Sequence, residues 1–79
     1  MGPKFHPEMR SFECTGAELH SFLDHLNAAG IAVDQPRAFG WKAETGTLYQ
    51  IDLLDGVEVS PELGKAVIDS FLAGRKTTL

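Results

Sequence analysis

A single cysteine, Cys14, is the feature that most limits what this chain can fold into. Its 79 residues leave room for one domain with one hydrophobic core. One cysteine can form neither an intrachain disulfide nor a Cys-rich zinc site, which are the usual stabilising devices of very small folds. A core of this size rarely supplies more than about 3 to 5 kcal/mol of net stability. We therefore expect tight packing or oligomerisation to stabilise the fold.

The composition indicates a folded protein and argues against two classes of partner. Hydrophobic residues make up 43% of the chain and charged residues 23%, as in packed globular domains. The net charge of −4 argues against nucleic acid, because non-specific binding depends on Lys and Arg contacts with phosphates, and only seven such residues are present. The longest run without a polar side chain, 28–33, is too short to span a membrane. Without an export signal and with a free thiol, the chain is expected to be cytoplasmic.

The clearest local signal is the segment Thr15-Gly-Ala-Glu18, which has the pattern of a helix capping box. It predicts a helix over 16–29. Gly30 follows at the position where a left-handed residue commonly ends a helix. The apolar stripe of this helix consists of Leu19, Phe22, Leu23 and Leu26.

A second helix is predicted over 61–73. Ser60 is a good N-cap, and Pro61 suits the first helical position. Gly74 is placed to end this helix. Its apolar stripe consists of Leu63, Ala66, Val67 and Phe71.

Two strands and a hairpin account for the remaining predicted structure. Alternation predicts a strand over 9–14 and a short one over 31–33, followed by a turn at 34–37. A hairpin is expected over 38–54, with its turn at 44–47. Alternate residues of each hairpin strand should face the core. They are Phe39, Trp41, Ala43, Tyr49, Ile51 and Leu53.

These elements predict an α+β fold in the order β-α-β-β-β-α. Two helices would pack on one face of a small, mostly antiparallel sheet of three or four strands. Residues 1–8, which include Pro3 and Pro7, are expected to form a flexible N-terminal arm. A single domain should cover 9–76, and 77–79 should form a tail.

Cys14 is the only residue that suggests covalent chemistry. A thiol just before a helix N-terminus can have a lowered pKa, so the chain could be a thiol-based enzyme or redox sensor. Phosphatase-type chemistry would need an arginine six residues later, and that position holds His20. A buried structural cysteine is the favoured interpretation, since free cysteine is among the most buried residue types.

Two polar groups are weak candidates for metal or partner binding. His20 and Asp24 lie one turn apart on the first helix and could hold a metal, although a solvated helix face is favoured. An acidic group around the second turn could hold a cation or a basic partner, but it lacks the spacing of an EF-hand. It consists of Asp52, Asp55, Glu58 and Glu62.

The aromatic residues of the hairpin allow two interpretations. Trp41 with Phe39 and Tyr49 could stack nucleic-acid bases, as in single-strand binders. Their shared parity and the scarcity of nearby positive charge favour a place in the core. Neither a glycine-rich phosphate loop nor a catalytic serine motif is present, and no cofactor is implied.

Protein–protein contact is the favoured function, and a homodimer its expected form. The chain is not expected to be an enzyme, since no nucleophile comes with a base. A small acidic inhibitor that blocks a basic groove, like those of phages, is a further alternative. The proposed interface rests on apolar side chains beyond those that one core needs, which are Leu48, Leu54, Ile68 and Leu72.

Overall fold

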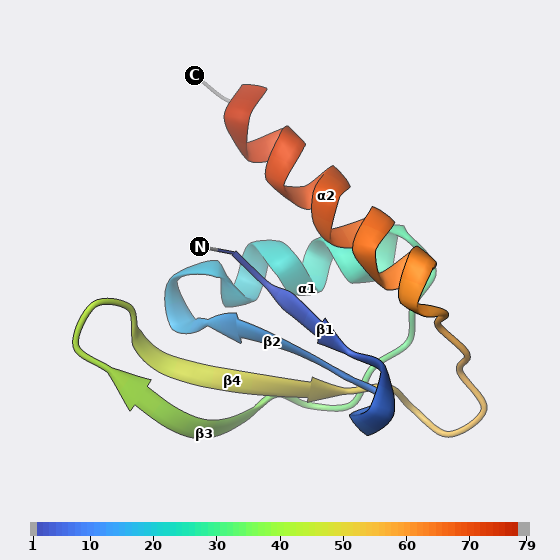
Figure 1. The fold of residues 1–79 in the computed structure, drawn as a ribbon, viewed down its shortest axis with the longest axis horizontal. Coiled ribbons are helices and arrows are strands. Elements are labelled where there is room, and N and C mark those ends of the chain that lie inside the picture. The colour runs from blue at the N-terminus through green and yellow to red at the C-terminus, as the bar shows by residue number, and fades with distance from the viewer. Residues whose placement is uncertain (1, 78–79) are drawn as a thin grey trace.

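A four-stranded sheet with two helices on one face makes up the fold (Figure 1). The computed structural model describes residues 2–77, and the strands pair in the order β1–β2–β4–β3, with each neighbouring pair antiparallel. The predicted α+β class is confirmed. The elements in chain order are β1 (Lys4–His6), the 3-10 turn η1 (Pro7–Met9), β2 (Ser11–Thr15), the 3-10 turn η2 (Gly16–Glu18), α1 (Leu19–Ala28), β3 (Arg37–Lys42), β4 (Gly46–Asp52) and α2 (Pro61–Thr77).

The core lies between the helices and the two central strands. Phe12 on β2 and Ile51 on β4 are register partners and have no solvent exposure. Phe22 of α1 makes edge contacts with both Phe12 and Phe71, at ring-centroid distances of 5.5 and 5.1 Å. Aromatic rings from β2, α1 and α2 thus form a continuous chain through the core, in the edge-on geometry that such rings prefer.

The predicted capping box and the glycine that ends the first helix are both present, but residues 16–18 form the 3-10 turn η2 and the α-helix begins at Leu19. The backbone N–H of Thr15 donates to Glu18 Oε1 at 3.5 Å, and the Thr15 hydroxyl donates to the same oxygen at 3.0 Å. Gly30 has a φ of 78°, and the N–H groups of Gly30 and Ile31 donate to the Asn27 and Leu26 carbonyls. This is the Schellman arrangement, which satisfies carbonyls that the helix itself leaves unpaired.

The second helix starts as predicted but continues further. Ser60 Oγ accepts from the Leu63 N–H at 3.0 Å, as an N-cap should. Gly74, predicted to end the helix, lies inside it, because α2 extends to Thr77. Of the predicted tail 77–79, Thr77 is therefore helical, and residues 78–79 lie outside the described part of the chain.

The predicted flexible arm contains a strand, so that prediction was wrong for residues 4–6. Lys4–His6 forms β1, which pairs with β2 through Lys4–Glu13, Phe5–Phe12 and His6–Ser11. Phe5 packs against the core, and its ring lies 4.6 Å from that of Phe12. Pro3 and Pro7 flank the strand instead of interrupting it, as is common at a sheet edge.

The strand predicted over 31–33 is reduced to one bridge, between Val33 and Leu53. Hydrogen bonds from Asp34 N–H to the Asp52 carbonyl and from Leu54 N–H to the Ala32 carbonyl hold it beside the end of β4. The observed order is therefore β-β-α-β-β-α instead of β-α-β-β-β-α.

The length and hydrophobicity of the two helices bear on whether either could span a membrane. Among residues 2–77, neither helix combines the length and the apolar character that crossing a membrane would require.

Candidate functional site

The outer edge of β3 carries the most exposed aromatic side chains of the chain. Phe39 is 52% exposed and Trp41 is 69% exposed. Within residues 2–77, β3 pairs only with β4, so its other side presents backbone groups without a strand partner. Figure 1 shows β3 at the side of the sheet farthest from α2. An apolar edge of this kind is a known site of strand pairing with another chain.

The prediction that Phe39 and Trp41 lie in the core was wrong, because both are exposed. The register of β3 with β4 shifts between Ala38 and Gly40, which leaves Phe39 as the extra residue of a bulge. Trp41 pairs with Thr47, which has the parity of Ile51, so its exposure does not come from the register. The helices pack more closely against β1 and β2 than against β3, which leaves the two rings largely exposed. Tyr49, by contrast, is half-buried, and Ile51 and Leu53 are buried as predicted.

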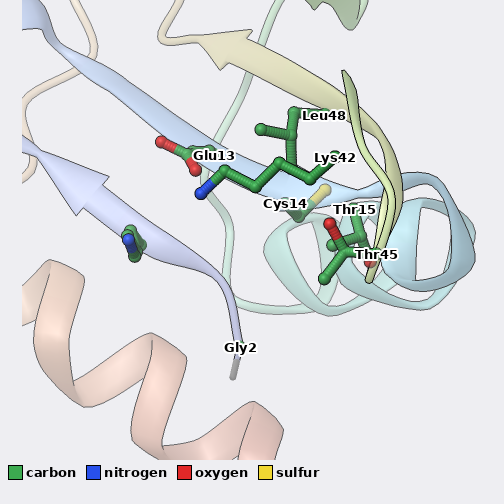
Figure 2. Close-up of a pocket in the computed structure, with 8 residues that line it drawn as sticks. Gly2, Glu13, Cys14, Thr15, Lys42, Thr45 and Leu48 are labelled. Carbon is green, nitrogen blue, oxygen red and sulfur yellow. The ribbon is translucent and has the colours of Figure 1, made fainter. Parts of the chain in front are cut away.

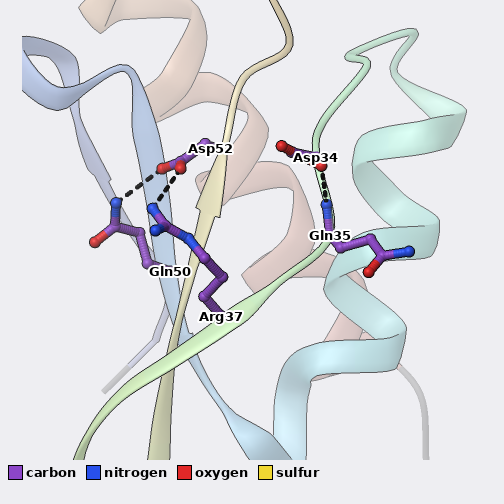
Figure 3. Close-up of polar contacts among 5 residues, drawn as sticks. All are labelled: Asp34, Gln35, Arg37, Gln50 and Asp52. Atoms are coloured by element: carbon purple, nitrogen blue, oxygen red, sulfur yellow. Dashed lines mark hydrogen bonds and ion pairs between the residues drawn. The ribbon is translucent and has the colours of Figure 1, made fainter.

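An ion pair ties the start of β3 to the end of β4 on the face without helices. An Arg37 guanidinium nitrogen donates to Asp52 Oδ2 at 2.6 Å, and Gln50 Nε2 donates to Asp52 Oδ1 at 2.8 Å (Figure 3). Both carboxylate oxygens of Asp52 therefore accept a hydrogen bond. The positive charge of Arg37 is compensated inside the chain, so the aromatic edge carries little unpaired charge at this end.

A small hollow of about 100 Å³ opens near the other end of β3. Figure 2 shows the Lys42 side chain laid across β2, with its ammonium group on the side of Glu13. Glu13 Oε1 accepts a hydrogen bond from His6 Nε2 at 3.0 Å. Thr45, in the turn between β3 and β4, has a buried Oγ1 with no hydrogen-bond partner in the described residues. The hollow is lined by Gly2, Lys4, Glu13, Cys14, Thr15, Lys42, Thr45 and Leu48.

Cys14 lies in the core and is poorly suited to nucleophilic chemistry. Its side chain belongs to the buried cluster, and the residue is 3% exposed. Burial, together with the carboxylates of Glu18 and Glu13, raises the pKa of the Cys14 thiol to about 12. The reactive species of a cysteine is the thiolate, which this environment disfavours. The position before a helix therefore does not activate Cys14.

The predicted metal and acidic candidates do not come together in the structure. His20 and Asp24 are both exposed on α1. Within residues 2–77, no three His, Cys, Asp or Glu side chains are grouped so that they could hold a metal ion. Of the acidic group, Asp52 pairs with Arg37, whereas Asp55, Glu58 and Glu62 are exposed on the loop after β4 and the first turn of α2.

The four leucine and isoleucine residues predicted as an interface do not form one surface. Leu48 and Ile68 are each only 9% exposed, and Ile68 belongs to the core cluster. Leu72 is half-buried against that cluster, so Leu54, at 42% exposure, is the only exposed member. Leu48 does face the side without helices, as its parity indicates, but it forms part of the wall of the hollow.

Comparisons with known proteins do not assign this arrangement to a family. No protein-family model, no curated protein and no solved structure matches the chain.

Proposed function

We propose that this chain works by protein–protein contact and self-associates through the outer edge of β3. The observation that carries the proposal is the exposure of Phe39 and Trp41 on a strand that has one unpaired side. Pairing of two such edges would remove both rings from water and satisfy the free backbone groups.

A second copy is the partner that best suits this edge. Because Asp52 neutralises Arg37, and Lys42 turns across β2, the middle of β3 is apolar and nearly uncharged. Two copies could therefore meet without strong like-charge repulsion. A small fold without disulfides also gains stability from such burial, and closed two-fold dimers are the commonest soluble oligomers.

Trp41 allows a direct test because it is the only tryptophan of the chain. Self-association should move its fluorescence emission to shorter wavelength as protein concentration rises, since the indole leaves water. Sedimentation equilibrium should show a dimer over the same range. Phe39→Lys places a charge on the edge and retains Trp41 as the reporter, so it should remain monomeric with a solvent-exposed indole at all concentrations.

Leu63→Lys is the matched control, because Leu63 is similarly exposed but lies on α2. It should associate like the unaltered chain. A chain that stays monomeric at every concentration would overturn the proposal, as would equal effects of the two lysine variants. Quenching of Trp41 by a single-stranded oligonucleotide at physiological salt would also overturn it, and would point to base stacking instead.

A further inference from the structure

The hollow beside Lys42 is assembled from three separate parts of the chain. Lys4 comes from β1, Glu13 and Thr15 come from β2, and Lys42 and Thr45 come from the β3–β4 hairpin. Its lining includes Lys42, the last residue of β3, but neither Phe39 nor Trp41, on which the proposed self-association depends. We propose that this hollow binds a phosphate group.

The first argument is local charge. Neither Lys4 nor Lys42 forms an ion pair within the described residues. The carboxylate of Glu13 also lines the hollow, but it already accepts from His6. The two ammonium groups outweigh the one carboxylate. The hollow is therefore positive in a chain whose net charge is −4.

The second argument is a hydroxyl group without a partner. Thr45 Oγ1 is buried and makes no hydrogen bond in the part of the chain that the structure describes. Buried polar atoms in folded proteins nearly always have a partner, so an orphan of this kind needs an explanation. An oxygen of a ligand in the hollow would accept from this hydroxyl.

The third argument concerns the shape and number of the donors. Two lysines from opposite edges of the sheet and a threonine from a turn line a space of about 100 Å³. A phosphate group offers several charged acceptor oxygens in a compact tetrahedron. Lys binds phosphate well as a point charge, and the nearby Glu13 should weaken this binding without abolishing it.

Titration with inorganic phosphate, against chloride at matched ionic strength, tests the proposal by NMR. The backbone amide signals of Lys4, Lys42 and Thr45 should shift together and saturate. Lys42→Met should weaken binding about tenfold, as expected for loss of one charged hydrogen bond. Glu13→Gln should tighten it by roughly two- to fivefold, because a repelling charge is removed.

Lys65→Met is the matched control, since it removes the same charge from α2, where Lys65 pairs with Asp69. It should leave binding unchanged. Shifts that do not saturate, equal effects of the two lysine variants, or weaker binding by Glu13→Gln would overturn the proposal.

Two carriers distinguish the source of the phosphate group. Glycerol phosphate represents a small metabolite, and a phosphoserine peptide represents a modified protein; the source is the carrier that binds more tightly than inorganic phosphate. If neither does, the hollow takes an adventitious ion only, and the proposal fails. All titrations are repeated in the Phe39→Lys background, so that failure of self-association and failure of phosphate binding are seen separately.

Discussion

The two edges of the sheet are built in opposite ways. β1 is three residues long, is flanked by prolines, and is covered by α2, whose Gly64 lies directly against the Phe5 ring. β3 is six residues long, has exposed aromatic side chains, and lies at the side of the sheet farthest from α2. Short, proline-flanked and covered edges prevent unwanted pairing, whereas long apolar edges invite it. The difference indicates that one edge is closed by the fold and the other is open for contact.

The largest expected effect concerns Cys14, which lies on β2 beside the closed edge. Its pKa of about 12, against an ordinary 9.0, lowers the thiolate population at neutral pH by about a thousandfold. Alkylation by iodoacetamide should therefore be slower in the folded chain than in the unfolded chain by at least about that factor. A folded rate within tenfold of the unfolded rate would show that the β1 edge opens readily.

The raised pKa of Cys14 also makes the free energy of unfolding depend on pH. The folded state holds the Cys14 proton more tightly than the unfolded state, so the stabilising contribution is complete below pH 9.0. It should be lost as the pH rises from there toward about 12. Urea unfolding of the chain and of Cys14→Ala should differ in pH dependence over this range.

A methyl group on Gly64 should disrupt the closed edge. A Cβ at this position would overlap the Phe5 ring, so Gly64→Ala must push α2 away from β1. We expect a loss of about 1 to 3 kcal/mol in the free energy of unfolding, measured with urea. Gly74→Ala is the control on the same helix, because a Cβ there meets nothing within 4 Å, and it should stabilise by up to about 1 kcal/mol. Equal effects of the two substitutions would refute the close contact.

The smallest expected effect concerns the ion pair at the open edge. Asp52→Asn should lower the free energy of unfolding by only about 0.2 to 1 kcal/mol, because Arg37 is largely exposed. It should also weaken self-association, since it leaves the charge of Arg37 uncompensated on β3. Asp69→Asn makes the same charge change on α2 and should leave association unaffected. Sedimentation equilibrium of both variants at low salt distinguishes the two expectations.

Sequence reasoning succeeded where the signal was local. The capping box at Thr15 and Glu18, the glycine at position 30 and the N-cap at Ser60 each involve groups within a few residues of one another. Such patterns need no knowledge of the rest of the fold. They placed the caps of both helices and the end of the first correctly, but not the 3-10 turn at 16–18 that precedes α1.

Sequence reasoning failed where the structure depends on distant contacts. β1 has only Phe5 as an apolar contact with the core, and its pairing depends on β2 and α2. The bulge at Phe39 shifts the register of β3 by one residue, and the local sequence alternation gave no sign of it. The hollow at Lys42 draws on three separate segments, so no local spacing indicated it.

The contact between Phe5 and Gly64 also has a consequence for the order in which the fold forms. β1 precedes every other element of the described chain, whereas α2, which covers it, follows them all. During synthesis, both edges of the sheet are therefore bare until α2 leaves the ribosome. Contacts between such distant segments slow folding and expose unpaired strands to other chains. We therefore expect folding of the nascent protein to be completed only when α2 packs over β1, which is later than the small size of the domain would indicate.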